Sequence, residues 1–193
     1  MSWIQTYTNI QFWPLNPRPQ DVYIEDIAHS LANVCRFGGH CRKFYSVAQH
    51  SCLVALDIKR RGICHCASEA RVQHIQLLAL LHDAAEAYTA DIARPIKPAW
   101  PEFVAIESRL LNTILDGLGV APDVEVYQTI KFCDDTLLAT EARDLMGPPP
   151  SSWCPLPEPL PEVIVPQSSE VAELEFLAMW RQLRRNCGTP SRS

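Results

Sequence analysis

The stretch LLALLHDAAEAYTAD, residues 77–91, is a dense apolar run with an ionisable pair at its centre. Its content of Leu and Ala predicts a helix that begins near Ser68, runs to Ala87 and is buried on most sides. The pair His82-Asp83 interrupts the run. A buried carboxylate there costs several kcal/mol unless a cation or hydrogen-bond donors compensate it. The pair therefore indicates either a metal site or a helix end at which His82 is hydrogen-bonded and Asp83 is solvated.

The remaining chain also reads as helices, which are separated by proline-rich segments. Apolar residues recur at spacings of three and four, which predicts helices over residues 24–35, 47–58, 103–115, 124–146 and 171–180. Proline predicts an extended lead-in over residues 1–23 and a surface loop over residues 147–167. The predicted fold class is all-α, a single bundle of about six main helices over residues 24–186. A flexible tail is expected over residues 187–193.

Composition limits the class of protein. The net charge of −5 argues against a protein that binds a nucleic-acid backbone, since such proteins usually carry a basic surface. No signal peptide is evident, and the longest apolar runs are far shorter than a membrane span. We therefore expect a cytoplasmic protein with no nucleic-acid or membrane partner. Cysteines without a CxxC pair predict reduced thiols, at positions 35, 41, 52, 64, 66, 133, 154 and 187.

Two other predicted helices carry ionisable residues on apolar faces. His50 lies in mid-helix on a face that otherwise carries valines, where a leucine would be usual. Asp134 lies on a similarly apolar helix, and spacing alone does not separate it from the adjacent Asp135. Neutral imidazole and carboxylate are standard ligands for divalent transition metals. Together with the pair at residues 82–83, they predict a divalent metal: Zn, Mn or Co, with Mg as a candidate second ion.

Further charged residues add candidate catalytic and binding groups. Glu86 follows Asp83 by three residues, so the two share a face of the predicted helix. In that position Glu86 can act as a general base or pass a proton to a leaving group, whereas elsewhere it would be an ordinary solvent-facing residue. Cations near a metal suit a phosphate substrate, because they neutralise its non-bridging oxygens. The basic candidates, each of which alone also suits a solvated surface, are Arg36, Lys97 and Lys131.

The pattern formed by His50, the His82-Asp83 pair and Asp134 resembles the HD-domain phosphohydrolase superfamily. The resemblance covers residues 22–146. It extends to three segments that look like those of small bacterial 5′-deoxynucleotidases and of phage enzymes that remove phosphate from dATP. These segments are RFGGHCRKFYSVAQHS (36–51), LLHDAAEAYTADIARPIK (80–97) and IKFCDDTLLATEARDLM (130–146).

This resemblance implies a role for each matching residue. The metal ligands it implies are His50, His82, Asp83 and Asp134. Asp134 is preferred over Asp135 because it completes a K-x-x-D pattern begun at Lys131. The implied catalytic residues are Glu86, which positions or activates the attacking water, and Asp91.

The substrate-binding residues are implied in the same way. Arg36 and Phe37 resemble an Arg-Trp pair of the family, with Phe in place of Trp. In that pair the arginine meets phosphate or sugar and the aromatic ring packs against the nucleoside. Pro95 and Lys97 match a loop that lines the nucleotide pocket, and Lys131 adds a further cation.

The activity that the resemblance implies is removal of phosphate from 2′-deoxynucleoside 5′-phosphates by attack of metal-bound water on phosphorus. A triphosphate such as dATP is slightly favoured over a monophosphate because of the candidate cations. The same site would also suit a cyclic nucleotide or an inorganic polyphosphate. The alternative from another class is a metal-containing, nucleotide-binding regulator without turnover. Small relatives often assemble, so a homo-oligomer is expected.

Overall fold

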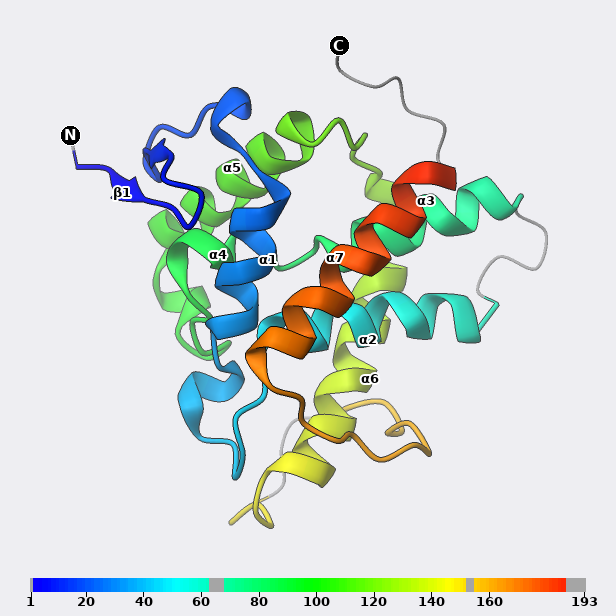
Figure 1. The fold of residues 1–193 in the computed structure, drawn as a ribbon. Coiled ribbons are helices and arrows are strands. Elements are labelled where there is room, and N and C mark those ends of the chain that lie inside the picture. The colour runs from blue at the N-terminus through cyan, green and yellow to red at the C-terminus, as the bar shows by residue number, and fades with distance from the viewer. Residues whose placement is uncertain (1, 63–67, 152–154, 187–193) are drawn as a thin grey trace.

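Within residues 2–62, 68–151 and 155–186, which the computed structural model describes, the chain forms seven α-helices and one two-stranded antiparallel sheet (Figure 1). The all-α prediction is therefore confirmed. The helices are α1 (Ile24–Asn33), α2 (Val47–Arg60), α3 (Glu69–Leu80), α4 (Glu86–Thr89), α5 (Pro101–Gly117), α6 (Tyr127–Leu145) and α7 (Ser169–Asn186). Short 3-10 helices are η1 (Pro19–Asp21), η2 (Arg36–Gly39), η3 (Lys97–Ala99) and η4 (Val124–Val126). The lead-in carries the strands β1 (Ile4–Gln5) and β2 (Gln11–Phe12).

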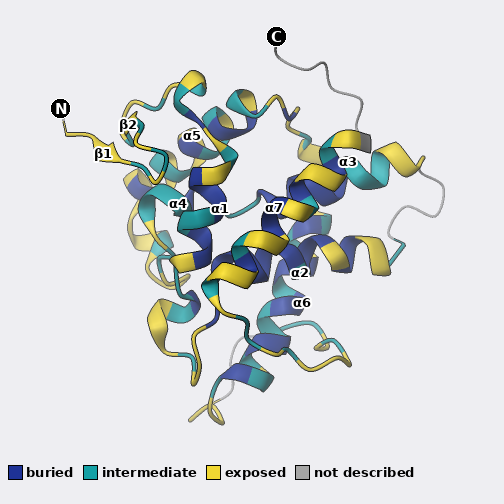
Figure 2. Ribbon diagram, viewed as in Figure 1, coloured by how far each residue is buried: buried dark blue, intermediate teal, exposed yellow. Residues whose placement is uncertain are grey.

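Helix α2 lies at the centre of the bundle and packs against α1, α3, α6 and α7. Figure 2 shows buried residues gathered where α1, α2 and α7 meet. The helix begins at a serine cap, since the backbone N–H of Gln49 donates to Ser46 Oγ at 3.1 Å. His50 follows in the first turn and is fully buried. The central position of α2 therefore brings a histidine into the core of the bundle.

The predicted helix over residues 68–87 is broken, and this part of the prediction is wrong. Helix α3 begins after the cap residue Ser68, as predicted, but it ends at Leu80. Residues 81–85 form turns, in which the backbone N–H of Glu86 donates to the carbonyl of Asp83 at 2.9 Å. Consecutive residues of a regular helix point about 100° apart. The turn instead lets His82 and Asp83 face the same point, with His82 Nε2 and Asp83 Oδ2 3.1 Å apart.

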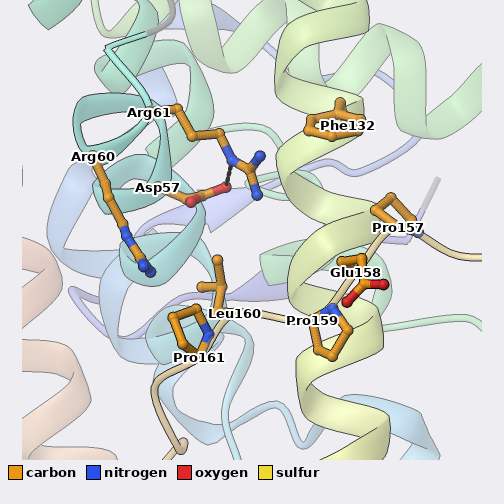
Figure 3. Close-up of a pocket in the computed structure, with 9 residues that line it drawn as sticks. All are labelled: Asp57, Arg60, Arg61, Phe132, Pro157, Glu158, Pro159, Leu160 and Pro161. Carbon is orange, nitrogen blue, oxygen red and sulfur yellow. Dashed lines mark hydrogen bonds and ion pairs between the residues drawn. The ribbon is translucent and has the colours of Figure 1, made fainter.

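The proline-rich segment forms no helix in its described parts, residues 147–151 and 155–167, as predicted. It returns along α6, where the N–H of Leu160 donates to Thr140 Oγ1 at 2.9 Å. Its prolines wall a groove beside α2 and α6 (Figure 3). In this groove Arg61 Nε donates to Asp57 Oδ2 at 2.5 Å, so these two charges are paired.

The described cysteines are free thiols, as predicted for Cys35, Cys41, Cys52 and Cys133. Positions 64, 66, 154 and 187, and the tail over residues 187–193, lie outside the described residues. None of the described helices has the length and apolar character needed to cross a membrane.

Gly117 lets the end of α5 approach the lead-in closely. A Cβ atom there would lie 2.5 Å from the Pro19 carbonyl oxygen and 2.9 Å from Val22 Cβ. We therefore expect Gly117→Ala to lower the free energy of unfolding by about 1–3 kcal/mol, because backbone must move to relieve the overlap. Urea unfolding followed by circular dichroism measures this. Asn112→Ala, at an exposed position of the same helix, should change it by less than about 0.5 kcal/mol. Equal stability of both variants would contradict the expected close approach.

Candidate metal centre

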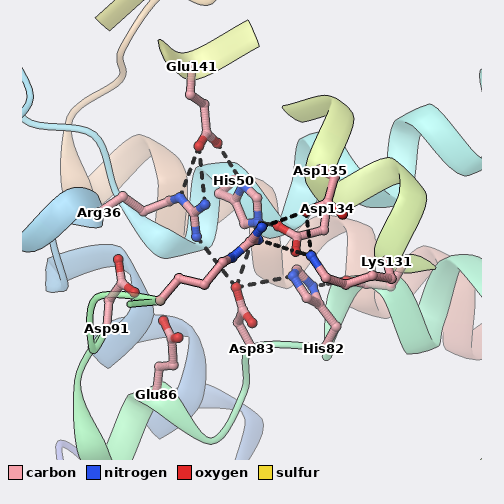
Figure 4. Close-up of polar contacts among 12 residues, drawn as sticks. Arg36, His50, His82, Asp83, Glu86, Asp91, Lys131, Asp134, Asp135 and Glu141 are labelled. Atoms are coloured by element: carbon pink, nitrogen blue, oxygen red, sulfur yellow. Dashed lines mark hydrogen bonds and ion pairs between the residues drawn. The ribbon is translucent and has the colours of Figure 1, made fainter. Parts of the chain in front are cut away.

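Three segments bring four ionisable side chains together in the bundle (Figure 4). They are His50 of α2, His82 and Asp83 of the turn after α3, and Asp134 of α6. Ligand atoms of His50, His82 and Asp134 lie within 4.8 Å of one another. Asp83 Oδ2 joins them, 3.7 Å from His50 Nε2 and 3.1 Å from His82 Nε2. Neighbouring ligands bound about 2.1 Å from one ion are separated by about 3–4 Å, so the spacing fits a single metal.

Both imidazoles are oriented for metal binding. Nδ1 of His82 lies 2.7 Å from the carbonyl oxygen of Ala79, and Nδ1 of His50 lies 2.6 Å from Glu141 Oε1. Each acceptor requires Nδ1 to carry a proton, so in the neutral imidazole the free lone pair is on Nε2. In the described part of the chain both Nε2 atoms are buried without a hydrogen-bond partner. Histidines that bind metals commonly donate their other ring N–H to an oxygen in this way, so these residues fit the predicted ion.

The charges of the centre compensate one another. Burial by itself would lower the pKa of His50, and Arg36 acts in the same direction, but Glu141 and Asp134 outweigh both and raise it to about 9. Burial would raise the pKa of Asp134, whereas its contact with His50 and the nearby His82 hold it well below its usual range. The buried carboxylates of Asp134 and Glu141 therefore need a positive charge nearby to stay ionised. A protonated imidazole or a divalent ion can provide this charge.

The geometry separates the two adjacent aspartates that the spacing left open. Asp134 Oδ1 lies 3.3 Å from His50 Nε2. The Asp135 carboxylate instead pairs with Lys131 and accepts from Arg94 Nη1 at 2.7 Å. Asp134 is therefore the aspartate that the fold brings to the histidines, in agreement with the K-x-x-D pattern.

Glu86 and Lys97 adjoin the centre, as expected. Glu86 is buried, its Oε2 has no hydrogen-bond partner among the described residues, and Lys97 Nζ lies 3.7 Å from its Oε1. Burial, reinforced by the negative charges of Asp83 and Asp91, raises the pKa of Glu86 well above its usual value. Its carboxyl group therefore holds a proton more readily than an exposed glutamate. Lys97 is also held by Glu107 Oε1, at 3.1 Å.

The 3-10 turn η2 presents Arg36 to the centre. Phe37 adopts a left-handed backbone conformation, with φ of 56°, which a non-glycine residue rarely adopts. Its N–H donates to Asp91 Oδ2 at 3.2 Å. This hydrogen bond to Asp91 therefore helps to keep the turn in its strained conformation. Arg36 is buried, and its Nη1 lies 3.6 Å from Asp83 Oδ2.

Two residues near the centre escaped the sequence analysis. Arg94 Nη2 lies 3.1 Å from Asp134 Oδ2, whereas the predicted Pro95 beside it is exposed in the loop before η3. Glu141 is fully buried and contacts both His50 and Arg36. Glu141 follows Asp134 by seven residues, which is two helical turns, so the apolar face of α6 could have indicated it.

Comparison with known proteins places the chain in a family. No family model matches it. It is 37% identical over 161 residues to the uncharacterized protein YfdR of Escherichia coli, which covers 83% of this chain and 82% of YfdR. The chain belongs to the YfdR family. An uncharacterized protein of Rhodobacter capsulatus is 35% identical over 138 residues, which is 69% of this chain and 67% of that relative. The names of both relatives assign no chemistry to this YfdR-family member.

Two neighbouring substitutions test the ligand set of this YfdR-family protein. Asp134→Asn should lower the metal bound after dialysis against Zn, Mn or Co by at least about tenfold, because a coordinating carboxylate is lost. Asp135→Asn removes the same charge one residue away and should retain the metal. Elemental analysis of both variants measures this. Loss of metal in the Asp135 variant alone would reverse the assignment.

The buried Glu86 predicts a dependence of stability on pH. Its folded-state pKa is raised above the usual 4.5, so its stabilising contribution is complete below pH 4.5 and is lost as the pH rises through the folded value. Glu86→Gln cannot ionise. The metal-free variant should therefore gain stability over metal-free wild type as the pH rises from 4.5 to 8, by about 1.4 kcal/mol for each unit of pKa shift. Urea unfolding measures the difference. Glu102→Gln, at an exposed position, is the control, and a difference independent of pH would contradict the prediction.

Proposed function

We propose that this protein is a metal-dependent phosphohydrolase that removes phosphate from 2′-deoxynucleoside 5′-phosphates. The observation that carries the proposal is the pair of buried Nε2 atoms, of His50 and His82, which lie 3.1–3.3 Å from the carboxylates of Asp83 and Asp134 and make no hydrogen bond among the described residues. The resemblance of the same residues to the HD-domain phosphohydrolases supports it.

A divalent ion held by these four residues would supply Lewis acidity, which lowers the pKa of a water molecule from about 16 to about 7 and polarises a phosphoryl oxygen. The surrounding side chains would do the remaining work. The raised pKa of Glu86 suits it to give a proton to the leaving oxygen as its bond to phosphorus breaks. The attacking water forms the new bond to phosphorus, and one of its protons restores Glu86 to its starting state.

Four cations adjoin the centre and would bind the phosphate oxygens. They are Arg36, Arg94, Lys97 and Lys131, and each now pairs with a carboxylate. A phosphate can take the place of these carboxylate partners, because the guanidinium and ammonium groups bind both kinds of oxygen. A triphosphate carries up to four negative charges, so this number of cations favours a deoxynucleoside triphosphate such as dATP over a monophosphate.

A substrate panel tests the proposal. We expect release of phosphate from deoxynucleotides in the presence of Mn, Co or Zn, faster than from the matching ribonucleotides and fastest from a triphosphate. The panel comprises mono-, di- and triphosphates of both sugars, each with Mn, Co, Mg and Zn. Fastest release from monophosphates would make the protein a deoxynucleoside 5′-monophosphatase. Metal and nucleotide binding without release from any member would point to a regulator and overturn the proposed activity.

Glu86→Gln tests the proton-transfer step separately. It should keep its metal content but lose about two to four orders of magnitude in kcat, because Gln has no proton of suitable acidity to give. His82→Ala is the comparison, since it should lose metal and activity together. Full activity of the Glu86 variant would remove this residue from the mechanism.

A further inference from the structure

Glu141 is buried one layer behind the candidate metal centre and does not itself face it. It lies two turns after Asp134 in α6 and has no exposed surface. Its Oε1 accepts a hydrogen bond from His50 Nδ1 at 2.6 Å. Its Oε2 accepts from both Nε and Nη2 of Arg36, each at 3.2 Å (Figure 4). A single carboxylate therefore connects a candidate metal ligand to a candidate phosphate-binding group.

We propose that Glu141 is a positioning residue: it holds His50 with Nε2 directed at the metal, and is itself held by Arg36. This inference rests on the proposed function and extends it to a residue outside the ligand set. Glu141 acts through its partners, because the opposite end of each partner reaches the centre. His50 Nε2 lies 3.3 Å from Asp134 Oδ1, and Arg36 Nη1 lies 3.6 Å from Asp83 Oδ2.

The chemistry of the acceptor determines the state of the imidazole. An ionised carboxylate can only accept hydrogen bonds, so the nitrogen that faces it must carry the proton. In neutral His50 the lone pair is then on Nε2, as a metal ligand requires. Without this acceptor His50 could exchange its two tautomers or rotate its ring. The arrangement of His50 that binds the metal would then be only one of several that the side chain adopts. The metal would therefore bind more weakly.

The alternative is that Glu141 serves only the stability of the bundle. A buried ion pair is a poor stabilising device, because the cost of removing both charges from water is comparable to their attraction. Apolar side chains would fill the same space at no such cost. The three N–H donors that Glu141 receives come from the two residues whose other ends reach the centre, and the buried Tyr45 hydroxyl adjoins the same carboxylate. A positioning role explains this pairing, and stability alone does not.

The matched control is Thr140, which precedes Glu141 in α6 and is also fully buried. Its Oγ1 donates to the Thr136 carbonyl at 2.7 Å and accepts from the N–H of Leu160 at 2.9 Å. Thr140→Val keeps the shape of the side chain and removes these bonds. It should lower stability without changing any hydrogen bond of His50.

The experiment compares wild type, Glu141→Ala, Glu141→Gln and Thr140→Val. For each protein, competition with a chromophoric chelator measures the dissociation constant of Zn²⁺, and urea unfolding measures stability. We expect Zn²⁺ to bind about 10- to 100-fold more weakly to both Glu141 variants, the usual effect of losing such a partner. Gln is nearly isosteric with Glu. However, if its oxygen faces His50, its amide N–H₂ must face the donors of Arg36, so this variant loses both hydrogen bonds from Arg36.

The tautomer of His50 provides a second measurement, independent of turnover. In the ¹H–¹⁵N spectrum of the Zn²⁺-loaded protein, the Nδ1 proton of His50 should be visible and slow to exchange in wild type and in Thr140→Val. It should be lost in Glu141→Ala. If that variant does not fold, Glu141→Gln carries the test through its Zn²⁺ affinity.

The outcomes separate the inference from the proposed function. Tight Zn²⁺ binding to wild type, with Glu141 variants within about twofold of it, would overturn the positioning role and leave the proposed phosphohydrolase intact. An equal loss of affinity in Thr140→Val would assign Glu141 a structural role only. Failure of wild type to bind Zn²⁺, Mn²⁺ or Co²⁺ would overturn the metal centre and, with it, the role of Glu141.

Discussion

Two buried imidazole nitrogens, Nε2 of His50 and Nε2 of His82, face the same point of the bundle and have no hydrogen-bond partner in the described part of the chain. A buried polar atom in this state costs about 1–3 kcal/mol. A helical bundle that needed only a stable core would place apolar side chains there. The central position of α2, the turn after α3 and the neighbouring α6 together hold these atoms beside two carboxylates.

The balance of charge around these nitrogens explains the remaining polar residues. Asp83, Asp134 and Glu141 are held in their ionised form by the imidazoles and by Arg36. At Glu86, by contrast, burial and the negative charges of Asp83 and Asp91 outweigh Arg36 and Lys97, and the pKa is raised. One cluster of carboxylates thus contains both ionised groups suited to binding a cation and one group suited to carrying a proton.

Residue types and apolar spacing were sufficient to predict most of the helices and the core of the centre. His50, His82, Asp83 and Asp134 are recognisable because each interrupts an apolar pattern in which a charge is costly. The break after Leu80 was not predictable from that spacing, because apolar residues lie on both sides of it. Arg94 was missed for a related reason, since an arginine in a loop is usually solvated.

By itself, the sequence determined an all-α bundle and the set of ionisable residues placed on its apolar faces, because helical periodicity and the cost of burying charge are local properties of the chain. Apolar spacing left Asp134 and Asp135 open, and the family resemblance favoured Asp134. Only the tertiary structure placed Asp134 beside His50, tied Asp91 to the strained turn at Phe37, and revealed Glu141 behind His50. These depend on distances between segments far apart in the chain. Such distances depend on how α2, α6 and the turn pack together. They cannot be predicted from the spacing of residues within one segment.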